Sequence, residues 1–279
     1  LNCKGHVDHY LEPFLVLAAG KFVKPDVKKK VFLDLLVQVV ANALYYNPAL
    51  TLQILHKHSL TAGVFTKWFE MIWRTTKKGG CQHFKRENDK KICVIGLATI
   101  LQLPAAQLPP ELVAGTGQLV ASAVKLAADL RVLRQQKEQT LAEESGSSSD
   151  EYEEVDEAGD DDDDDDESWK PKASKMREQL FDLDDGDDED EDDWEDFYDY
   201  WDDEGDQVVT SPLDAIDAHV YFSDSLGAMQ ANEAERFNAM LAGMQDAKQR
   251  QLLEETMQYA NERRQALAQA QAQAAQPAS

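Results

Sequence analysis

The side chains with the most evident chemical potential are the carboxylates and aromatic rings between residues 143 and 206. This range holds 34 acidic residues against four basic ones, and five aromatic residues fall within positions 194–201. Carboxylates at this density attract and steer cationic proteins, and aromatic rings stack on arginine side chains. Phosphate groups would be repelled, which disfavours nucleic acid as a partner. The alternative is a solvated tract that has no binding role and only keeps the protein soluble.

The sequence therefore predicts a polyelectrolyte site that captures a basic protein. Three features favour this interpretation over a solvated tract: the acidic range lies between two predicted folded regions, it carries aromatic residues, and its charge density is high. The candidate binding residues are Asp160, Asp161, Asp162, Asp163, Asp164, Asp165, Asp166, Glu167, Asp184, Asp185, Asp187, Asp188, Asp190, Asp192, Asp193, Trp194, Tyr198 and Trp201.

Other motifs give weaker signals. Two groups of residues could be imagined as zinc ligands: Cys3 with His6 and His9, and Cys81 with His83. Neither group supplies four ligands locally, so we interpret them as ordinary residues on helix faces and not as a zinc site. The glycine in residues 182–186 falls one position early for a calcium loop. Residues 115–117 lack the lysine of a phosphate loop. We therefore expect no enzyme activity, no metal and no cofactor.

The net charge of -25 is sharply partitioned along the chain. Residues before 143 carry 19 basic against ten acidic side chains, including clusters at 28–30 and 77–91 onto which the acidic range could fold back. Three scattered cysteines indicate a reducing compartment. No apolar run is long enough to span a bilayer. The first residues are neither an initiator methionine nor a signal peptide, which suggests a fragment.

The elements around the acidic range are predicted to be helices. Apolar residues recur at helical spacing over 27–43, after Pro25, and Asn47 followed by Pro48 is typical of a helix start. Further helices are predicted over 61–77, 90–103 and 110–139, ended by glycines or prolines. Paired helices at a period of about 40 residues favour a HEAT-type repeat stack over an unrelated bundle.

Helix signals return after residue 211, where Asn232 and Asp246 each resemble an N-cap with a box partner three positions later. The predicted fold class is thus all-α, a HEAT-repeat α-solenoid with a long disordered acidic insert. The predicted divisions are helical repeats over 1–142, the insert over 143–210, final repeats over 211–267 and a frayed tail over 268–279.

Several segments resemble one family of proteins. The letters ALYYNP at 43–48 resemble a segment of the importin-seven/eight branch of the importin-β (karyopherin-β) nuclear transport receptors. Residues 90–97 are similar to another helix of that branch, 190–195 to its acidic loop, and 250–264 to its final helix. The matches occur in order and span most of residues 10–265.

The resemblance implies a HEAT-repeat receptor that binds basic protein cargo, such as ribosomal proteins or histones, and shuttles between cytoplasm and nucleus. It further implies nucleoporin contacts and release of cargo by Ran-GTP, whose main binding surface lies in N-terminal repeats; no residue here is assigned to Ran. Membrane insertion is not expected. The alternative is an acidic histone or ribosomal-protein chaperone without a transport role.

Overall fold

The computed structural model describes residues 5–27, 29–76, 81–146 and 211–274. Within these ranges the regular elements are helices, joined by turns and one isolated bridge between Thr75 and Cys81. The helices are α1 (Asp8–Phe22), α2 (Lys30–Tyr46), α3 (Pro48–Lys57), α4 (Thr61–Trp73), α5 (Glu87–Leu101), a short 3-10 turn (Ala105–Gln107), α6 (Pro110–Ala114), α7 (Thr116–Gly146), α10 (Ala218–Asn232), α11 (Ala234–Gly243) and α12 (Ala247–Ala274).

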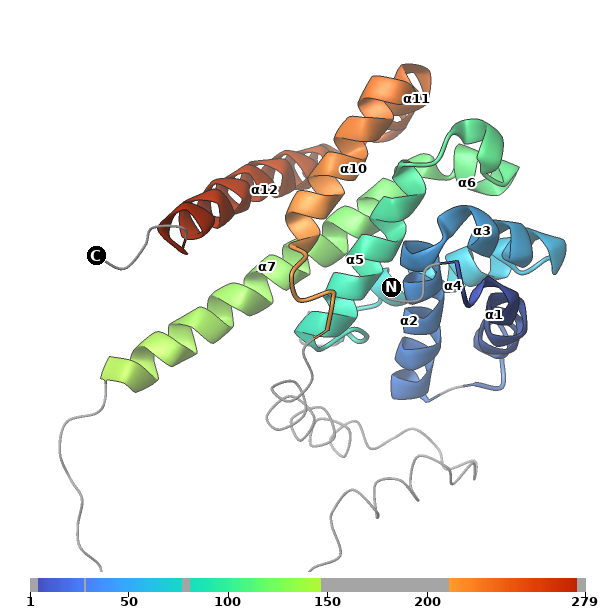
Figure 1. Cartoon of the computed structure of the whole chain (residues 1–279), viewed down its shortest axis with the longest axis horizontal. Coiled ribbons are helices and arrows are strands. Elements are labelled where there is room, and N and C mark those ends of the chain that lie inside the picture. The colour runs from blue at the N-terminus through green and yellow to red at the C-terminus, as the bar shows by residue number, and fades with distance from the viewer. Residues whose placement is uncertain (1–4, 28, 77–80, 147–210, 275–279) are drawn as a thin grey trace, which may run out of the picture.

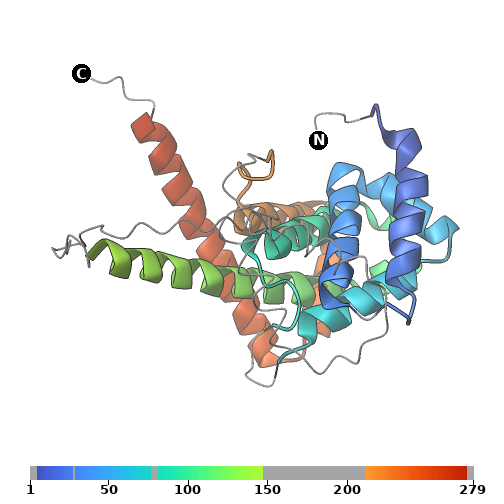
Figure 2. The ribbon, with the colours of Figure 1, turned by 90° about the horizontal axis from the view of Figure 1, so that it is seen from below.

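The helices form two layers. In one layer α5 packs against α2 on one side and against α10 on the other. In the second layer α7 packs against α4 and α12, and α5 also contacts α7 across the layers. Helices α1 and α2 lie at one end of this stack and α12 lies at the other (Figures 1 and 2). The prediction of an all-α HEAT-type solenoid is confirmed for the described residues.

Close packing and polar seams hold neighbouring helices together. Gly96 of α5 lies against the backbone of Ala41 in α2, where an added Cβ would come within 2.9 Å of the Ala41 Cα. Between α5 and α10, the Thr99 and Tyr221 hydroxyls lie 3.0 Å apart and Gln102 donates to Ser225 at 2.8 Å. One apolar core therefore runs through the stack, and these polar side chains pair with each other where α5 meets α10.

Several predicted helix ends are correct. Asn47 caps α3, its side chain accepting a hydrogen bond from the Leu50 amide at 3.2 Å. Asp246 accepts from the Lys248 amide at 2.9 Å at the start of α12. Helix α5 spans nearly the predicted range. None of the described helices is both long and apolar enough to cross a bilayer.

Other predicted ends in the first repeats are wrong. Helix α4 ends at Trp73 instead of continuing to Lys77, because Arg74 is extended and leads into the Thr75 bridge. Pro25 lies in a turn that precedes α2, since that helix begins only at Lys30.

The predicted helix over 110–139 is two helices that meet at Gly115. The glycine is needed there because a Cβ would lie 2.9 Å from the Glu111 carbonyl oxygen. Helix α7 then continues to Gly146, so the first residues assigned to the insert are helical.

The C-terminal helices also differ from the prediction. Asn232 is the last residue of α10, and Glu233 occupies the N-cap position of α11 without a side-chain cap. Helix α12 continues through residues 268–274, where fraying was expected. These residues are exposed, so the high helix propensity of alanine and glutamine accounts for the extension better than packing does.

Candidate functional site at the base of the acidic range

The predicted binding residues, from Asp160 to Trp201, lie outside the described residues, so their binding role stays a prediction. The structure does show the two points at which the acidic range is attached to the stack. The chain leaves the stack at the end of α7 and returns at Ser211. Of the seven α7 side chains beyond Arg134 whose exposure is described, six are exposed, and that end of the helix extends past the rest of the body (Figure 1).

The returning chain is held by short-range hydrogen bonds. The Ser211 amide donates to the Asp214 carboxylate at 2.6 Å, and the Leu213 amide donates to the Ser211 hydroxyl at 3.2 Å. The Lys91 ammonium of α5 lies 3.5 Å from the Asp214 carbonyl oxygen, at the outer limit of a hydrogen bond. Burial lowers the pKa of Lys91, and the nearby Arg134 charge lowers it further.

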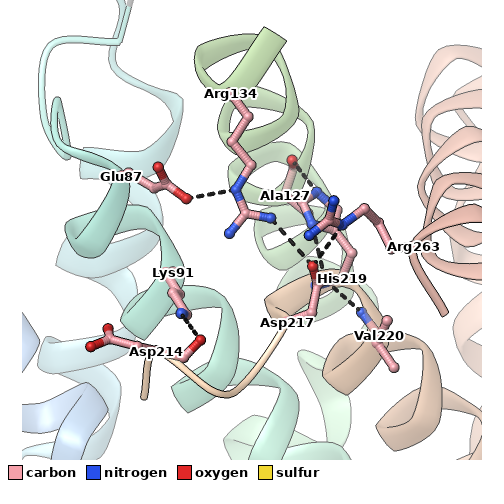
Figure 3. Close-up of polar contacts among 9 residues, drawn as sticks. All are labelled: Glu87, Lys91, Ala127, Arg134, Asp214, Asp217, His219, Val220 and Arg263. Carbon is pink, nitrogen blue, oxygen red and sulfur yellow. Dashed lines mark hydrogen bonds and ion pairs between the residues drawn. The ribbon is translucent and has the colours of Figure 1, made fainter. Parts of the chain in front are cut away.

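Asp217 is the centre of the site, and Figure 3 shows how its neighbours converge on it. Its carboxylate caps α10 by accepting from the amides of His219 at 3.0 Å and Val220 at 3.2 Å. It also accepts from the guanidinium of Arg263 in α12 at 2.9 Å and from that of Arg134 in α7 at 3.4 Å. One carboxylate thereby joins three helices.

The same carboxylate is almost fully buried, with 5% of its side chain exposed. Burial alone would raise the pKa of Asp217. Hydrogen bonds from His219 and the Val220 amide, together with the hydrogen bond and positive charge of Arg263, outweigh burial and hold that pKa well below its usual range. Asp217 is therefore ionised at all ordinary pH values.

Arg134 extends the network to a fourth helix. Its Nε lies 2.6 Å from the carboxylate of Glu87, in the first turn of α5. We call Glu87, Lys91, Arg134, Asp214, Asp217, His219 and Arg263 the basal network. Because it links α5, α7, α10 and α12, it fixes the point at which the chain re-enters the stack.

His219 completes the contact between α7, α10 and α12. Its buried ring bonds through Nε2 to the Ala127 carbonyl oxygen at 2.9 Å, so Nε2 carries the proton. The ring meets Tyr259 edge to face at 4.7 Å, and the Arg131 guanidinium lies 5.0 Å from the centroid of that tyrosine ring. A cavity of about 230 Å³, lined in part by His219 and Arg131, remains between these helices.

Two of the other candidate ligands, Cys81 and His83, contact acidic side chains. Cys81 donates to the Asp129 carboxylate at 2.7 Å, and burial together with this contact raises the pKa of the thiol to about 11. The His83 Nδ1 lies 2.7 Å from the buried Asp34 carboxylate. Among the described residues no three histidine, cysteine or acidic side chains are grouped as a metal site would require. Cys3 lies outside the described residues.

The basic stretch 77–91 is not the exposed cluster that the sequence suggested. The Lys90 ammonium is buried and bonds to the carbonyl oxygens of Phe84 and Lys85. Lys91 is buried against Asp214, and Arg86 forms a bidentate contact with the buried Asp89. Residues 77–80 lie outside the described residues. These three cations, of the nine in the two basic clusters, are therefore committed to the scaffold, and the expected fold-back of the acidic range stays a prediction for the others.

Sequence reasoning missed the basal network. Asp217 carries one usable signal, an aspartate directly before a helix. Nothing in the sequence pairs it with Arg134 or Arg263, which lie 83 and 46 positions away. The arrangement offers no nucleophile next to a base, so its chemistry is that of an anchor.

Stacked helix pairs with a long acidic range between α7 and α10 define a helical-repeat scaffold. Comparisons with known proteins give its relatives. The chain is similar to the importin beta-like SAD2 homolog of Arabidopsis thaliana, with 44% identity over 110 residues, which is 39% of this chain and 10% of that protein. It is 33% identical to importin-8 of Homo sapiens over 134 residues, 47% of this chain and 12% of that protein.

A third relative, the probable importin-7 homolog of Dictyostelium discoideum, is 29% identical over 145 residues, 51% of this chain and 13% of that protein. Over the aligned residues, the chain is similar to proteins named importin beta-like, importin-7 and importin-8, in agreement with the resemblance that its motifs indicated. It covers only about a tenth to an eighth of the length of these relatives. No protein-family model and no solved structure matches the chain.

Proposed function

We propose that this chain is the cargo-contacting part of a nuclear import receptor, and that its acidic range captures basic proteins of the ribosomal or histone type. The observation that carries the proposal is the homology to importins combined with 34 acidic residues placed between two helices of the stack. On this proposal the receptor shuttles between cytoplasm and nucleus, contacts nucleoporins, and releases cargo when Ran-GTP binds.

The attachment of the acidic range supports the proposed role. Helices α7 and α10 both pack against α5, so the two helices that flank the acidic range belong to the same part of the scaffold. The basal network fixes the returning end through Asp217, so a cargo held by the acidic residues would remain tied to the receptor. A dense negative charge accelerates the encounter with cationic partners in a salt-dependent way.

The test compares three forms of the full chain. One, called the neutral form, has every Asp and Glu of residues 147–206 changed to Asn and Gln, one has the residues of 147–206 in scrambled order, and one is unchanged. Binding of a linker histone is measured across a range of salt concentrations. We expect the neutral form to lose affinity and most of its salt dependence, and the scrambled form to retain both, because charge density carries the attraction.

A salt curve of the neutral form that matches the unchanged chain would remove the acidic range as the cargo site. A loss of binding in the scrambled form would point instead to a sequence-specific contact, for example by Trp194 or Trp201. The alternative function, a chaperone that shields basic proteins without transport, predicts that Ran-GTP has no effect on histone release from the full-length protein. The receptor function predicts release.

A further inference from the structure

A serine that is followed directly by a proline lies where the chain re-enters the stack. Ser211 and Pro212 form the only serine–proline or threonine–proline pair among the 279 residues. Proline-directed protein kinases select such a pair, because the position after the phosphoacceptor in their active site suits a residue without an N–H. Ser211 therefore carries a recognition signal that the other serines and threonines of the chain do not carry.

Ser211 begins a tight turn at the surface. The Asp214 amide donates to the Ser211 carbonyl oxygen at 2.9 Å, and Pro212 takes the second position of the turn, where the fixed φ of proline is favoured. Ser211 is half-buried and its hydroxyl oxygen accepts from the Leu213 amide, whereas Pro212 and Asp214 are exposed. A kinase can thus approach the turn from the solvent side.

The hydrogen bonds of this turn are local. The Ser211 amide donates to the Asp214 carboxylate at 2.6 Å, three positions away, and the hydroxyl contact spans two positions. Leu213 packs against the apolar core and keeps the turn in place. Because local hydrogen bonds at an exposed turn open at a low cost in free energy, Ser211 and Pro212 can adopt the extended form that a kinase active site binds.

Lys91 of α5 lies against the same turn. Within the described residues Lys91 forms no ion pair, and its hydrogen bond goes to the Asp214 carbonyl oxygen at 3.5 Å (Figure 3). The side chain is buried, and burial and the Arg134 charge both lower its pKa. The surrounding carboxylates therefore compensate this cation only in part. An anion added to the turn would give Lys91 a charged partner, and lysine binds phosphate as a point charge.

We propose that Ser211 is a phosphorylation site for a proline-directed protein kinase, and that Lys91 holds the resulting phosphate. The kinase transfers the γ-phosphoryl group of ATP to the Ser211 Oγ. The bond from that phosphorus to the oxygen shared with the β-phosphate breaks, ADP leaves, and the hydroxyl proton passes to the catalytic base of the kinase and then to water. The product carries nearly two negative charges at neutral pH.

The modification strengthens the attachment of the returning chain to α5. In the unmodified chain the 3.5 Å contact of Lys91 makes this link, whereas the phosphate adds an ionic contact between the same two segments. The Asp214 carboxylate is exposed and can turn towards water, so its repulsion of the phosphate is screened. Asp217 anchors α10 separately through Arg263, so the scaffold stays folded in both states. The proposal does not depend on cargo binding.

Phosphorylation of the full chain in solution tests the site. Wild type and variants are incubated with a purified mitogen-activated protein kinase and Mg-ATP, and peptide mass spectrometry maps the phosphate. We expect phosphate at Ser211 in the wild type, none there in Ser211→Ala, and a several-fold lower rate in Pro212→Ala. Thr66→Ala, which removes an exposed hydroxyl of α4, is the matched control and should behave as the wild type does. A wild type without phosphate at Ser211, or equal rates for wild type and Pro212→Ala, would overturn the assignment.

Phosphorus-31 NMR of the phosphorylated chain tests the role of Lys91. A pH titration gives the second pKa of the phosphate, which a nearby cation lowers. Lys91→Met keeps most of the side-chain stem and removes the charge. We expect the phosphate pKa to be lower in the wild type than in Lys91→Met by about one pH unit. Lys248→Met, at an exposed position of α12, should match the wild type.

The same titration in urea supplies a reference that needs no substitution. The phosphate pKa of the folded wild type should lie below that of the unfolded wild type, because only the folded chain brings Lys91 to the turn. Equal pKa values in wild type and Lys91→Met, or a folded value at or above the value in urea, would overturn Lys91 as the cation that holds the phosphate.

Discussion

Removing the charge of Asp217 should loosen the attachment of α12 and of the chain that returns from the acidic range. Asp217→Asn keeps an N-cap acceptor for the His219 and Val220 amides, because asparagine caps helices as well as aspartate does. It removes the negative charge that faces Arg263 and Arg134. The substitution therefore separates the ionic contribution of this side chain from its contribution as a cap.

The magnitude follows from the burial of the three groups. Asp217 is 5% exposed and Arg134 is 15% exposed, so their contact is poorly screened, whereas Arg263 is 34% exposed and keeps part of its hydration. Arg134 also retains Glu87 as a partner. We expect Asp217→Asn to lower the free energy of unfolding by about 1–2 kcal/mol. Asp217→Ala, which also removes the cap, should cost about 1 kcal/mol more.

The pH dependence of this contribution has a definite sign. The pKa of Asp217 is lower in the folded chain than in the unfolded chain, where an aspartate titrates near about 3.9. Its stabilising contribution is therefore fully present above that pH and is lost as the pH falls towards the folded value. The difference between wild type and Asp217→Asn should be constant from about pH 5 to 8 and should shrink in stronger acid.

Urea unfolding followed by far-ultraviolet circular dichroism measures the loss, and hydrogen exchange locates it. Exchange should accelerate in residues 211–220 and along α12 before it does so in α2 or α5. Asp246→Asn is the matched control, since Asp246 caps α12 from an exposed position and forms no ion pair within the described part of the chain. An Asp217→Asn variant as stable as this control would refute the account of the basal network.

Three further predictions concern the rest of the scaffold. Gly96→Ala should lower the urea midpoint, because the new Cβ would press on the Ala41 backbone and cause a strain of about 1–3 kcal/mol. Gly227→Ala, on an open face of α10, should raise the midpoint. A shift of the midpoint in the same direction for both variants would contradict the tight packing of α2 on α5. Cys81 should resist iodoacetamide at about pH 8 in the folded chain and react once urea unfolds it, as mass spectrometry would detect, because its pKa is raised to about 11. Asn47→Ala should cost about 1 kcal/mol in urea unfolding through the lost cap of α3, and an unchanged midpoint would contradict that role.

Much of the helical stack could be predicted from the sequence, because apolar spacing and helix caps depend on residues that are close together in the chain. Apolar spacing locates α2 and α5, and Asn47 followed by Pro48 fixes the start of α3 to the residue. The errors occur where distant contacts decide the outcome. Helix α4 stops at Trp73 because residues 74–76 turn towards Cys81, and no periodicity over 61–77 encodes that pairing.

The site was harder to predict because charge in a sequence says nothing about burial. Lys90 and Lys91 count as basic residues next to Lys85 and Arg86, yet both are buried on α5. Lys90 satisfies backbone carbonyls of the loop before α5, and Lys91 reaches a carbonyl 123 positions further along the chain. Only the folded stack distinguishes these structural cations from cations that are available to a partner.

The position of the acidic range within the stack explains how the scaffold accommodates it. Helices α7 and α10 make few contacts with each other, but each packs against α5, and α12 packs against both. Within the described residues, α5, α12 and the Asp217 contacts therefore connect the helices on the two sides of the acidic range. Because the entropic cost of closing a loop rises only slowly with its length, a long connection at this point costs little more than a short one. Shortening 147–210 should accordingly leave the unfolding midpoint nearly unchanged, so any change in cargo binding would report on the acidic residues themselves.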